Sequence, residues 1–183
     1  MKLRSPATII AFVGLSLLAS CSRPTPAPPK SSVHFDTSLA MPEFMGHVVD
    51  PAAFGFWKGS GTEETSKGTR ELAPTTDEGW EALETSAAVL IEAGNLLQIP
   101  GRPRDPEDHW NKYAQDLTAR AIEGKAAAFK HDKQGVFETG AKIYEVCTAC
   151  HEEYVIQPQL KATGRAEGAP LPPWPSEVGA KVK

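Results

Sequence analysis

Residues 147–151 read Cys-Thr-Ala-Cys-His, and their side chains are the best suited to chemistry in this chain. Cys147, Cys150 and His151 stand at positions i, i+3 and i+4, so they share one face if the segment is helical. Two thiols at this spacing can add to the two vinyl groups of one porphyrin, and the imidazole can reach its iron from the same side. The run therefore predicts one covalently attached c-type haem (haem c), with His151 as the proximal iron ligand.

These thiols have other conceivable uses. A zinc site needs four nitrogen or sulfur ligands, usually in two separated pairs, and the chain has three cysteines with no second pair. A thioredoxin-like redox pair needs a βαβ context, which the flanking residues lack. A structural disulfide between Cys147 and Cys150 is open to an exported protein, but it gives His151 no role.

The first 21 residues predict export. Lys2 and Arg4 form a short basic start, and the apolar stretch 7–19 is too short to span a membrane in the mature protein. This pattern is typical of a signal peptide. Its end, Leu-Ala-Ser-Cys, resembles a bacterial lipobox, in which the cysteine is acylated and becomes the first mature residue. We expect Cys21 to carry lipid; the alternative is an ordinary signal peptide cleaved nearby, with Cys21 as a spare thiol.

Lipidation also accounts for the odd number of cysteines, because Cys21 takes the lipid and the other two take the haem. Several acyl chains on one residue anchor a protein stably where a single chain does not. By resemblance to lipobox proteins, Ser22 favours the outer membrane of a Gram-negative cell. Since bacterial c-type haem is attached outside the cytoplasm, both motifs predict the bacterial cell envelope, facing the periplasm.

The mature chain is expected to be acidic. Cleavage after Ser20 removes Lys2 and Arg4, so 17 basic side chains remain against 23 acidic ones, a net charge of −6. This balance argues against a nucleic-acid partner and against charge-driven binding to anionic lipid. It favours, weakly, a basic redox partner protein.

Composition divides the chain into four parts. We expect a lipoprotein signal peptide at 1–20, a Pro-rich tether at 21–36, a helical haem-binding domain at 37–156 and a Pro-rich irregular tail at 157–183. Residues 22–33 hold four prolines and show no apolar periodicity, which is typical of an extended tether. Trp174 in the tail is expected to pack against the helices.

Apolar residues recur at helical spacing in four segments of the domain. The expected helices cover 38–58, 75 to just before Pro100, 105 onward, and 132–154. The aromatic residues on their apolar stripes, Trp57, Trp80 and Trp110, are expected in the core. Residues 59–74 are expected to form a loop, and no strand is expected because no stretch alternates at period two.

Helix boundaries have their own signals. Asp50-Pro51 should kink or restart the first helix. A capping box that begins at Thr75 should start the second helix. Asp105 is expected as the N-cap of the third, with Pro106 at its first helical position.

Four amphipathic helices without strands predict an all-α fold, an antiparallel up-down-up-down four-helix bundle. With the haem motif in the last helix, the chain resembles the cytochrome c′ family, the class II c-type cytochromes, over about residues 38–155. The specific matches are the run 147–151 and a Met near the start of the first helix. The lipobox, the Pro-rich tail and the long loop after the first helix lie outside the usual family plan, so loop contacts are not carried over.

This topology places the start of the first helix beside the end of the last one, on the far side of the iron from His151. In low-spin relatives of cytochrome c′ a Met of the first helix binds the iron, whereas cytochrome c′ itself has an apolar side chain there and five-coordinate iron. We expect Met45 as the sixth ligand and Met41 as the next choice. The alternative is that both only pack against the haem. His47 cannot share the face of Met45.

The remaining histidines, His34, His109 and His131, are expected at the surface. The loop between the second and third helices should lie at the haem end of the bundle. It contains Arg102 and Arg104, whose guanidinium groups suit haem propionates. The alternative is that both are solvated.

These features together predict a membrane-anchored, extracytoplasmic monohaem cytochrome that carries one electron at a time to a redox partner protein, with a homodimer as one open oligomeric state. The alternative is a five-coordinate haem protein that binds NO or CO. An enzyme such as a peroxidase would need a distal acid/base pair, and no His or Arg is clearly placed beside Met45 to provide it, so we expect no catalysis.

Overall fold

The computed structural model describes residues 34–164 of the chain. This part is mostly helical, with one small sheet, as the helical periodicity predicts. The expected signal peptide, the lipidated Cys21 and Trp174 lie outside the described residues. Within residues 34–164, no helix combines the length and the apolar character that crossing a membrane requires.

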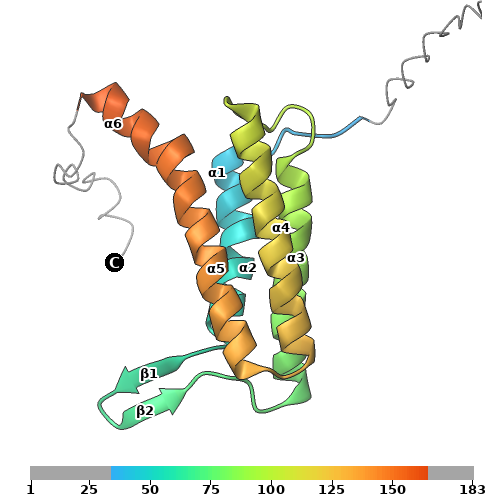
Figure 1. Ribbon diagram of the computed structural model, residues 1–183, viewed down its shortest axis with the longest axis vertical. Coiled ribbons are helices and arrows are strands. Elements are labelled where there is room, and N and C mark those ends of the chain that lie inside the picture. The colour runs from blue at the N-terminus through green and yellow to red at the C-terminus, as the bar shows by residue number, and fades with distance from the viewer. Residues whose placement is uncertain (1–33, 165–183) are drawn as a thin grey trace, which may run out of the picture. The chain divides into compact units, whose positions relative to one another are not determined.

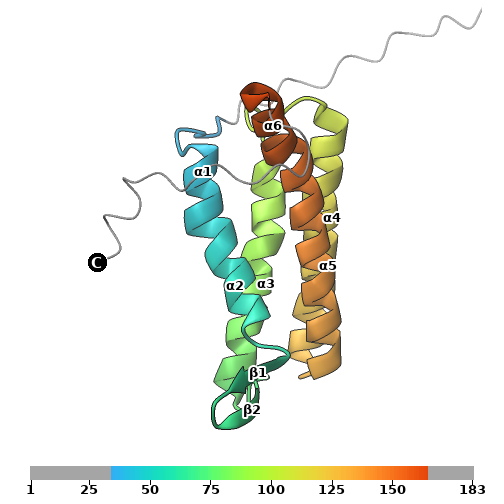
Figure 2. The same ribbon diagram turned by 90° about the vertical axis from the view of Figure 1, so that its left-hand side faces the viewer.

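Helices make up most of the elements, interrupted by one hairpin (Figure 1). In chain order they are α1 (Met41–Phe44), the π-helix η1 (Met45–Val49), α2 (Asp50–Trp57), β1 (Thr62–Thr65), β2 (Gly68–Glu71), α3 (Asp77–Leu97), α4 (Glu107–Phe129), α5 (Lys133–His151), the π-helix η2 (Glu152–Ile156) and α6 (Gln157–Thr163). In both views α1 and α6 lie at one end and the hairpin lies at the other (Figure 2).

The long helices pack on one another around a single apolar core. α3 contacts α2 and α4, while α5 contacts α4 and α2. Aromatic side chains link the helices as well as filling the core: the Trp110 indole Nε1 donates to the Leu97 carbonyl at 2.8 Å, and Trp57 Nε1 donates to the Gly140 carbonyl at 2.9 Å. Trp80 and Trp110 are buried, and Trp57 is half-buried, in agreement with their expected place.

The packing of an aromatic ring requires glycine at one core position. A Cβ at Gly124 of α4 would lie 2.7 Å from the ring of Phe56, which is itself fully buried in α2. Such a contact would force the ring or the helix to move. Gly124 therefore leaves room on α4 for the Phe56 ring of α2.

The first expected helix is one continuous helical stretch with an irregular centre. Pro51, which has no N–H to donate, lies in the first turn of α2, directly after the π-helical η1, where the regular α-helical hydrogen-bond pattern is already interrupted. The restart expected at Asp50-Pro51 is therefore present. Phe44, which directly precedes η1, and Val49, its last residue, are buried.

Two helix starts differ from expectation by one residue. The N-cap of α3 is Thr76, not Thr75, because the Thr76 hydroxyl accepts the Gly79 N–H at 3.2 Å. Pro106 is the N-cap of α4 rather than its first helical residue, since its ψ of 123° is extended. The Asp105 side chain makes no capping hydrogen bond there.

The expectation of no strands was wrong. Residues 62–71 form an antiparallel hairpin in which Thr62 pairs with Glu71 and Thr65 with Gly68. All eight strand residues are exposed, so neither face needs the apolar alternation that would have revealed a strand. Local contacts hold it instead, among them the ion pair of Arg70 with Glu63 at 2.7 Å.

The helix that carries the Cys-Thr-Ala-Cys-His run extends further than expected. Residues 157–163, expected to begin an irregular tail, form α6. Pro158 is compatible with this because it lies in the first turn of α6. The helix ends at Gly164, whose φ of 63° is left-handed.

Candidate functional site

The Cys-Thr-Ala-Cys-His run occupies the last turns of α5, so the helical spacing expected for it is present. Cys147 and Cys150 are half-buried free thiols, and His151 is exposed. All three line one cavity of about 370 Å³. The structure thus brings the three motif side chains to one wall of a single hollow between helices.

The other walls of this cavity come from the helices that surround α5. Its apolar and aromatic lining includes Met45, Val49, Ala53, Leu97, Trp110, Tyr113 and Leu117. A hollow of this size and polarity is typical of a cofactor or small-molecule site. Contact of such a surface with water is unfavourable, so an apolar ligand would be favoured there over solvent.

A second hollow of about 560 Å³ adjoins the first and lies toward η2 and α6. The two share Met45, Trp110, Cys150 and His151. Met41 lines only the second, together with Tyr154. Here "motif cavities" denotes these two hollows together.

Burial keeps both thiols protonated. Loss of solvation raises the pKa of Cys147 to about 11, with the Asp50 charge adding to the effect. Loss of solvation likewise raises the pKa of Cys150 to about 11, and the neighbouring Cys147 and Glu153 add while Arg104 opposes. Reactive redox cysteines have lowered pKa values, so this pair differs from a thioredoxin-like one.

Met45 is the methionine best placed toward the motif. It is half-buried at the start of η1 and lines both motif cavities together with His151. Met41, one turn earlier, is also half-buried but reaches only the second cavity. The structure therefore places the start of the first helical stretch beside the motif, as the expected topology requires.

The first helical stretch and the helix that carries the motif both change from α-helix to π-helix beside the motif cavities. The π-helix η1 begins at Met45, and His151 is the N-cap of the π-helix η2. Single π-helical turns inside α-helices occur frequently at functional sites. The two irregularities thus coincide with the two expected axial ligands.

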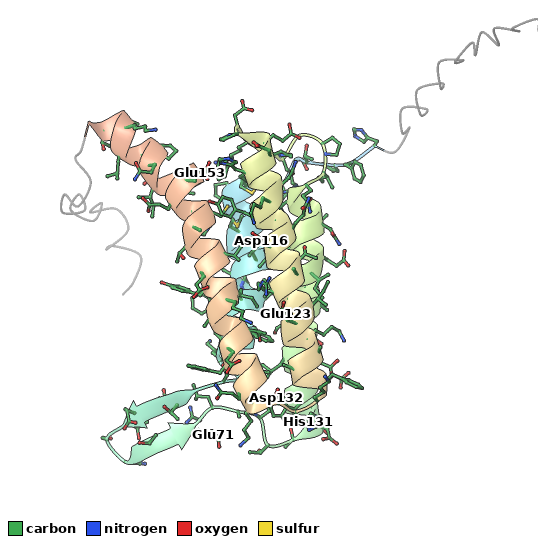
Figure 3. The ribbon with its side chains drawn as sticks, in the orientation of Figure 1. Glu71, Asp116, Glu123, His131, Asp132 and Glu153 are labelled. Carbon is green, nitrogen blue, oxygen red and sulfur yellow. The ribbon has the colours of Figure 1, made fainter. Side chains whose placement is uncertain are left out.

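Side chains that follow the motif fasten η2 to α4. One carboxylate oxygen of Glu153 lies 3.0 Å from Nδ1 of His109, and the other accepts from the Tyr113 hydroxyl at 3.1 Å. The Tyr154 hydroxyl donates to the Pro106 carbonyl at 2.6 Å. Glu153 lies at the end of the helices remote from the hairpin, which carries Glu71 (Figure 3).

Sequence reasoning missed this fastening, although part of it had a signal. Tyr154 continues the stripe of Cys147, Cys150 and His151 at helical spacing, and it is buried against Trp110 with ring centroids 5.0 Å apart. The partners of Glu153 had no signal, because they depend on how α4 is rotated against α5.

The two arginines expected near the haem differ in position. Arg104 is exposed, lies 5.7 Å from the Trp110 ring and lines the second motif cavity. Arg102 is buried, lies over the Phe44 ring and lines neither motif cavity. The structure therefore brings only Arg104 to the motif.

The other histidines lie at the surface as expected. The His47 side chain is 74% exposed and pairs with Glu43 at 3.1 Å. His34, His109 and His131 are also exposed. The His131 ring additionally stacks on Trp80, at the hairpin end and far from the motif.

Within residues 34–164, no three side chains of His, Cys, Asp or Glu gather as a metal site would require. Comparison with known proteins adds no relative: no protein-family model, curated protein or solved structure matches this chain.

Proposed function

We propose that this chain is a membrane-anchored c-type cytochrome that carries one electron at a time through a single haem c. The observation that carries the proposal is that Cys147, Cys150 and His151 line one apolar cavity, and that Met45 lines it from a different helix. When bound, the haem supplies reversible one-electron chemistry at its iron.

The side chains of the motif cavities fit this group. The two cysteines would hold the ring through thioethers, and the His151 imidazole would bind the iron from the same helix. The Met45 thioether reaches the cavities from η1, so it can approach the iron from the other side. Met41 is the second choice, because it lines only the second cavity.

For the haem propionates we propose Arg104 as a partner. Its charge already acts on Cys150, whose pKa it lowers against the larger effect of burial. An exposed guanidinium at the edge of the second cavity can bind a carboxylate without burying it. Arg102 is not proposed for this role, because it faces a different pocket.

We also propose an antiparallel up-down-up-down four-helix bundle of the cytochrome c′ type. The contacts of α2 and α4 with both α3 and α5 support this arrangement. The resemblance to the class II c-type cytochromes rests on that arrangement, on the motif in α5 and on a methionine at the start of the first helical stretch.

The proposed location is the bacterial cell envelope, with the protein tethered through lipid on Cys21 and facing the periplasm. The lipobox-like sequence and the haem motif support it independently. The proposed partner is a redox protein that binds the acidic surface of this chain. We propose no nucleic-acid partner and no bond-making chemistry.

Gas binding is the alternative function, and one observation favours it. Met45 is only half-buried, and a flexible methionine side chain can pack against the haem without binding the iron, which would leave the sixth position free for a diatomic molecule. Five-coordinate iron that binds NO or CO would then replace electron transfer as the main activity.

Visible spectra of the oxidised and reduced protein, with and without CO, distinguish the two. For a carrier we expect a low-spin spectrum in both states, slow or weak CO binding and a reversible one-electron potentiometric titration. A high-spin spectrum with ready CO binding would support gas binding instead of electron transfer. A spectrum without haem bands, after expression with haem-attachment machinery, would reject both.

A further inference from the structure

Arg102 is a buried cation without a counter-charge. Arg102 is only 8% exposed, and neither its Nε nor its Nη1 has a hydrogen-bond partner among the described residues. The Phe44 ring lies 4.5 Å from the guanidinium carbon and offsets part of the cost through a cation–π contact. Unpaired N–H donors of a buried guanidinium are costly, and an anion satisfies them best.

The guanidinium lines a small pocket of about 210 Å³. The pocket lies between two chain segments: residues 37–41, which end at the first residue of α1, and residues 101–104, between α3 and α4. Arg104, a second arginine, and Thr37 also line it. We call this hollow the arginine pocket.

The charge of the arginine pocket is uncompensated within the described residues. None of the side chains that line it is a carboxylate. Asp36 precedes one wall, but its carboxylate accepts the Ser38 N–H at 2.8 Å instead. Asp105 follows the other wall and is exposed outside the pocket. Arg102, Arg104 and Thr37 therefore line a small hollow that carries positive charge and no carboxylate, which suits one small anion.

The arginine pocket adjoins the second motif cavity, but Arg102 lies in the part that the two do not share. Arg104 and Met41 lie on the boundary between this pocket and the second motif cavity, whereas Arg102 lines neither motif cavity. An anion held by Arg102 would therefore lie outside the motif cavities as their lining residues define them.

We propose that the arginine pocket binds a phosphate-type oxyanion, with the Arg102 guanidinium as its main partner and the Thr37 hydroxyl as a further donor. Arg104 lies between this pocket and the second motif cavity, so it adds positive charge here even when its guanidinium binds a haem propionate. A planar fork that donates two parallel N–H bonds matches the geometry of phosphate oxygens. This site does not depend on the proposed electron transfer. The phosphate can be free in solution or part of a phospholipid headgroup, since Cys21, the expected lipid site, precedes Thr37 by only 16 residues.

A ³¹P NMR titration of the full-length, haem-loaded protein with inorganic phosphate tests the proposal, with ionic strength held constant by NaCl. We expect saturable binding to the wild type that weakens at least about tenfold in Arg102→Met, as loss of charge-assisted hydrogen bonds predicts. Arg104→Met should weaken it less. The matched control is Arg70→Met, because Arg70 lies on the exposed hairpin at the other end of the helices.

Vesicles separate the two sources. In the Cys21→Ser variant, binding to phosphatidylglycerol vesicles but not to phosphatidylcholine vesicles, lost again with Arg102→Met, would assign the site to a lipid headgroup. Absence of both phosphate binding and vesicle binding in the unmutated pocket overturns the proposal, whether or not Arg102→Met folds. Equal binding by Arg102→Met and the wild type also overturns it. So does a shifted reduction potential in Arg102→Met without any phosphate binding, which would place a propionate there.

Discussion

Met45 is the single residue on which the choice between electron carrier and gas binder depends. If its thioether binds the iron, Met45→Leu should make the reduced protein high-spin and reactive with CO. The reduction potential should fall by about 0.1 V, a part of the ~0.8 V range over which axial ligands set haem potentials. Visible spectroscopy and potentiometry measure both effects.

Met41→Leu is the matched control, because Met41 is also half-buried but lines only the second motif cavity. It should leave spin state and potential close to those of the wild type. An effect of Met41→Leu without one of Met45→Leu would assign the sixth ligand to Met41. A low-spin protein unaffected by either change would exclude both methionines.

The two motif thiols give the chain a pH dependence before haem is attached. Their pKa values, about 11 in the folded chain against an ordinary 9.0, mean that the folded chain keeps protons that the unfolded chain has lost. The free energy of unfolding should therefore be fully maintained below pH 9 and fall as the pH rises toward 11.

Urea unfolding of the haem-free chain between pH 8 and 11 measures this loss. Other groups titrate in the same range, so the comparison is with the Cys147→Ala/Cys150→Ala variant, whose stability should fall less steeply. Parallel curves for the two proteins would show that the thiols are not held in their neutral form.

At the residue level, the sequence predicted the arrangement of the Cys-Thr-Ala-Cys-His side chains but not which residues surround them. The spacing of Cys147, Cys150 and His151 predicts one shared face, and the structure has it. The separate positions of Arg102 and Arg104 were not predictable, because neighbouring loop residues can face different pockets and no periodicity tells which. Glu153 was missed for the same reason.

At the scale of elements, the segment after the motif is fastened to α4 mainly through Tyr154. Its buried hydroxyl donates to the Pro106 carbonyl at 2.6 Å. Tyr154→Phe should lower the free energy of unfolding by about 1 kcal/mol, the usual net value of one such hydrogen bond. Urea denaturation measures the change.

Tyr144→Phe is the matched control on the same helical stretch, because Tyr144 is 59% exposed. Removing its hydroxyl should change the stability by less than about 0.5 kcal/mol, as is usual at the surface. Equal effects of the two changes would mean that the Tyr154 contact does not fasten η2 to α4.

Helix existence was predictable, whereas helix ends and the hairpin were not. Apolar stripes of α3, α4 and α5 are long enough to fix helix type, and residues such as Leu90 and Ile143 are fully buried as those stripes require. The hairpin has two exposed faces and therefore no stripe. Pro158 suggested an end to the helix, but a proline in a first turn does not interrupt it.

At the scale of the whole molecule, we propose that lipid on Cys21 attaches the protein to the membrane. Within residues 34–164 there is no helix that could span a bilayer. Cys21→Ser should therefore move the mature protein from the membrane fraction to the soluble fraction after osmotic release. Continued membrane association of this variant would show that Cys21 is not acylated or that another contact holds the protein.

Covalent haem is the central claim, and denaturing gel electrophoresis with haem staining tests it most directly. Thioether bonds survive denaturation, so the wild type, expressed with haem-attachment machinery, should stain at its own mass and show an intact mass increased by one haem. Cys147→Ala/Cys150→Ala should lose both signals, while Cys21→Ser should keep them. An unstained wild type, or a double variant that retains covalent haem, would contradict the account.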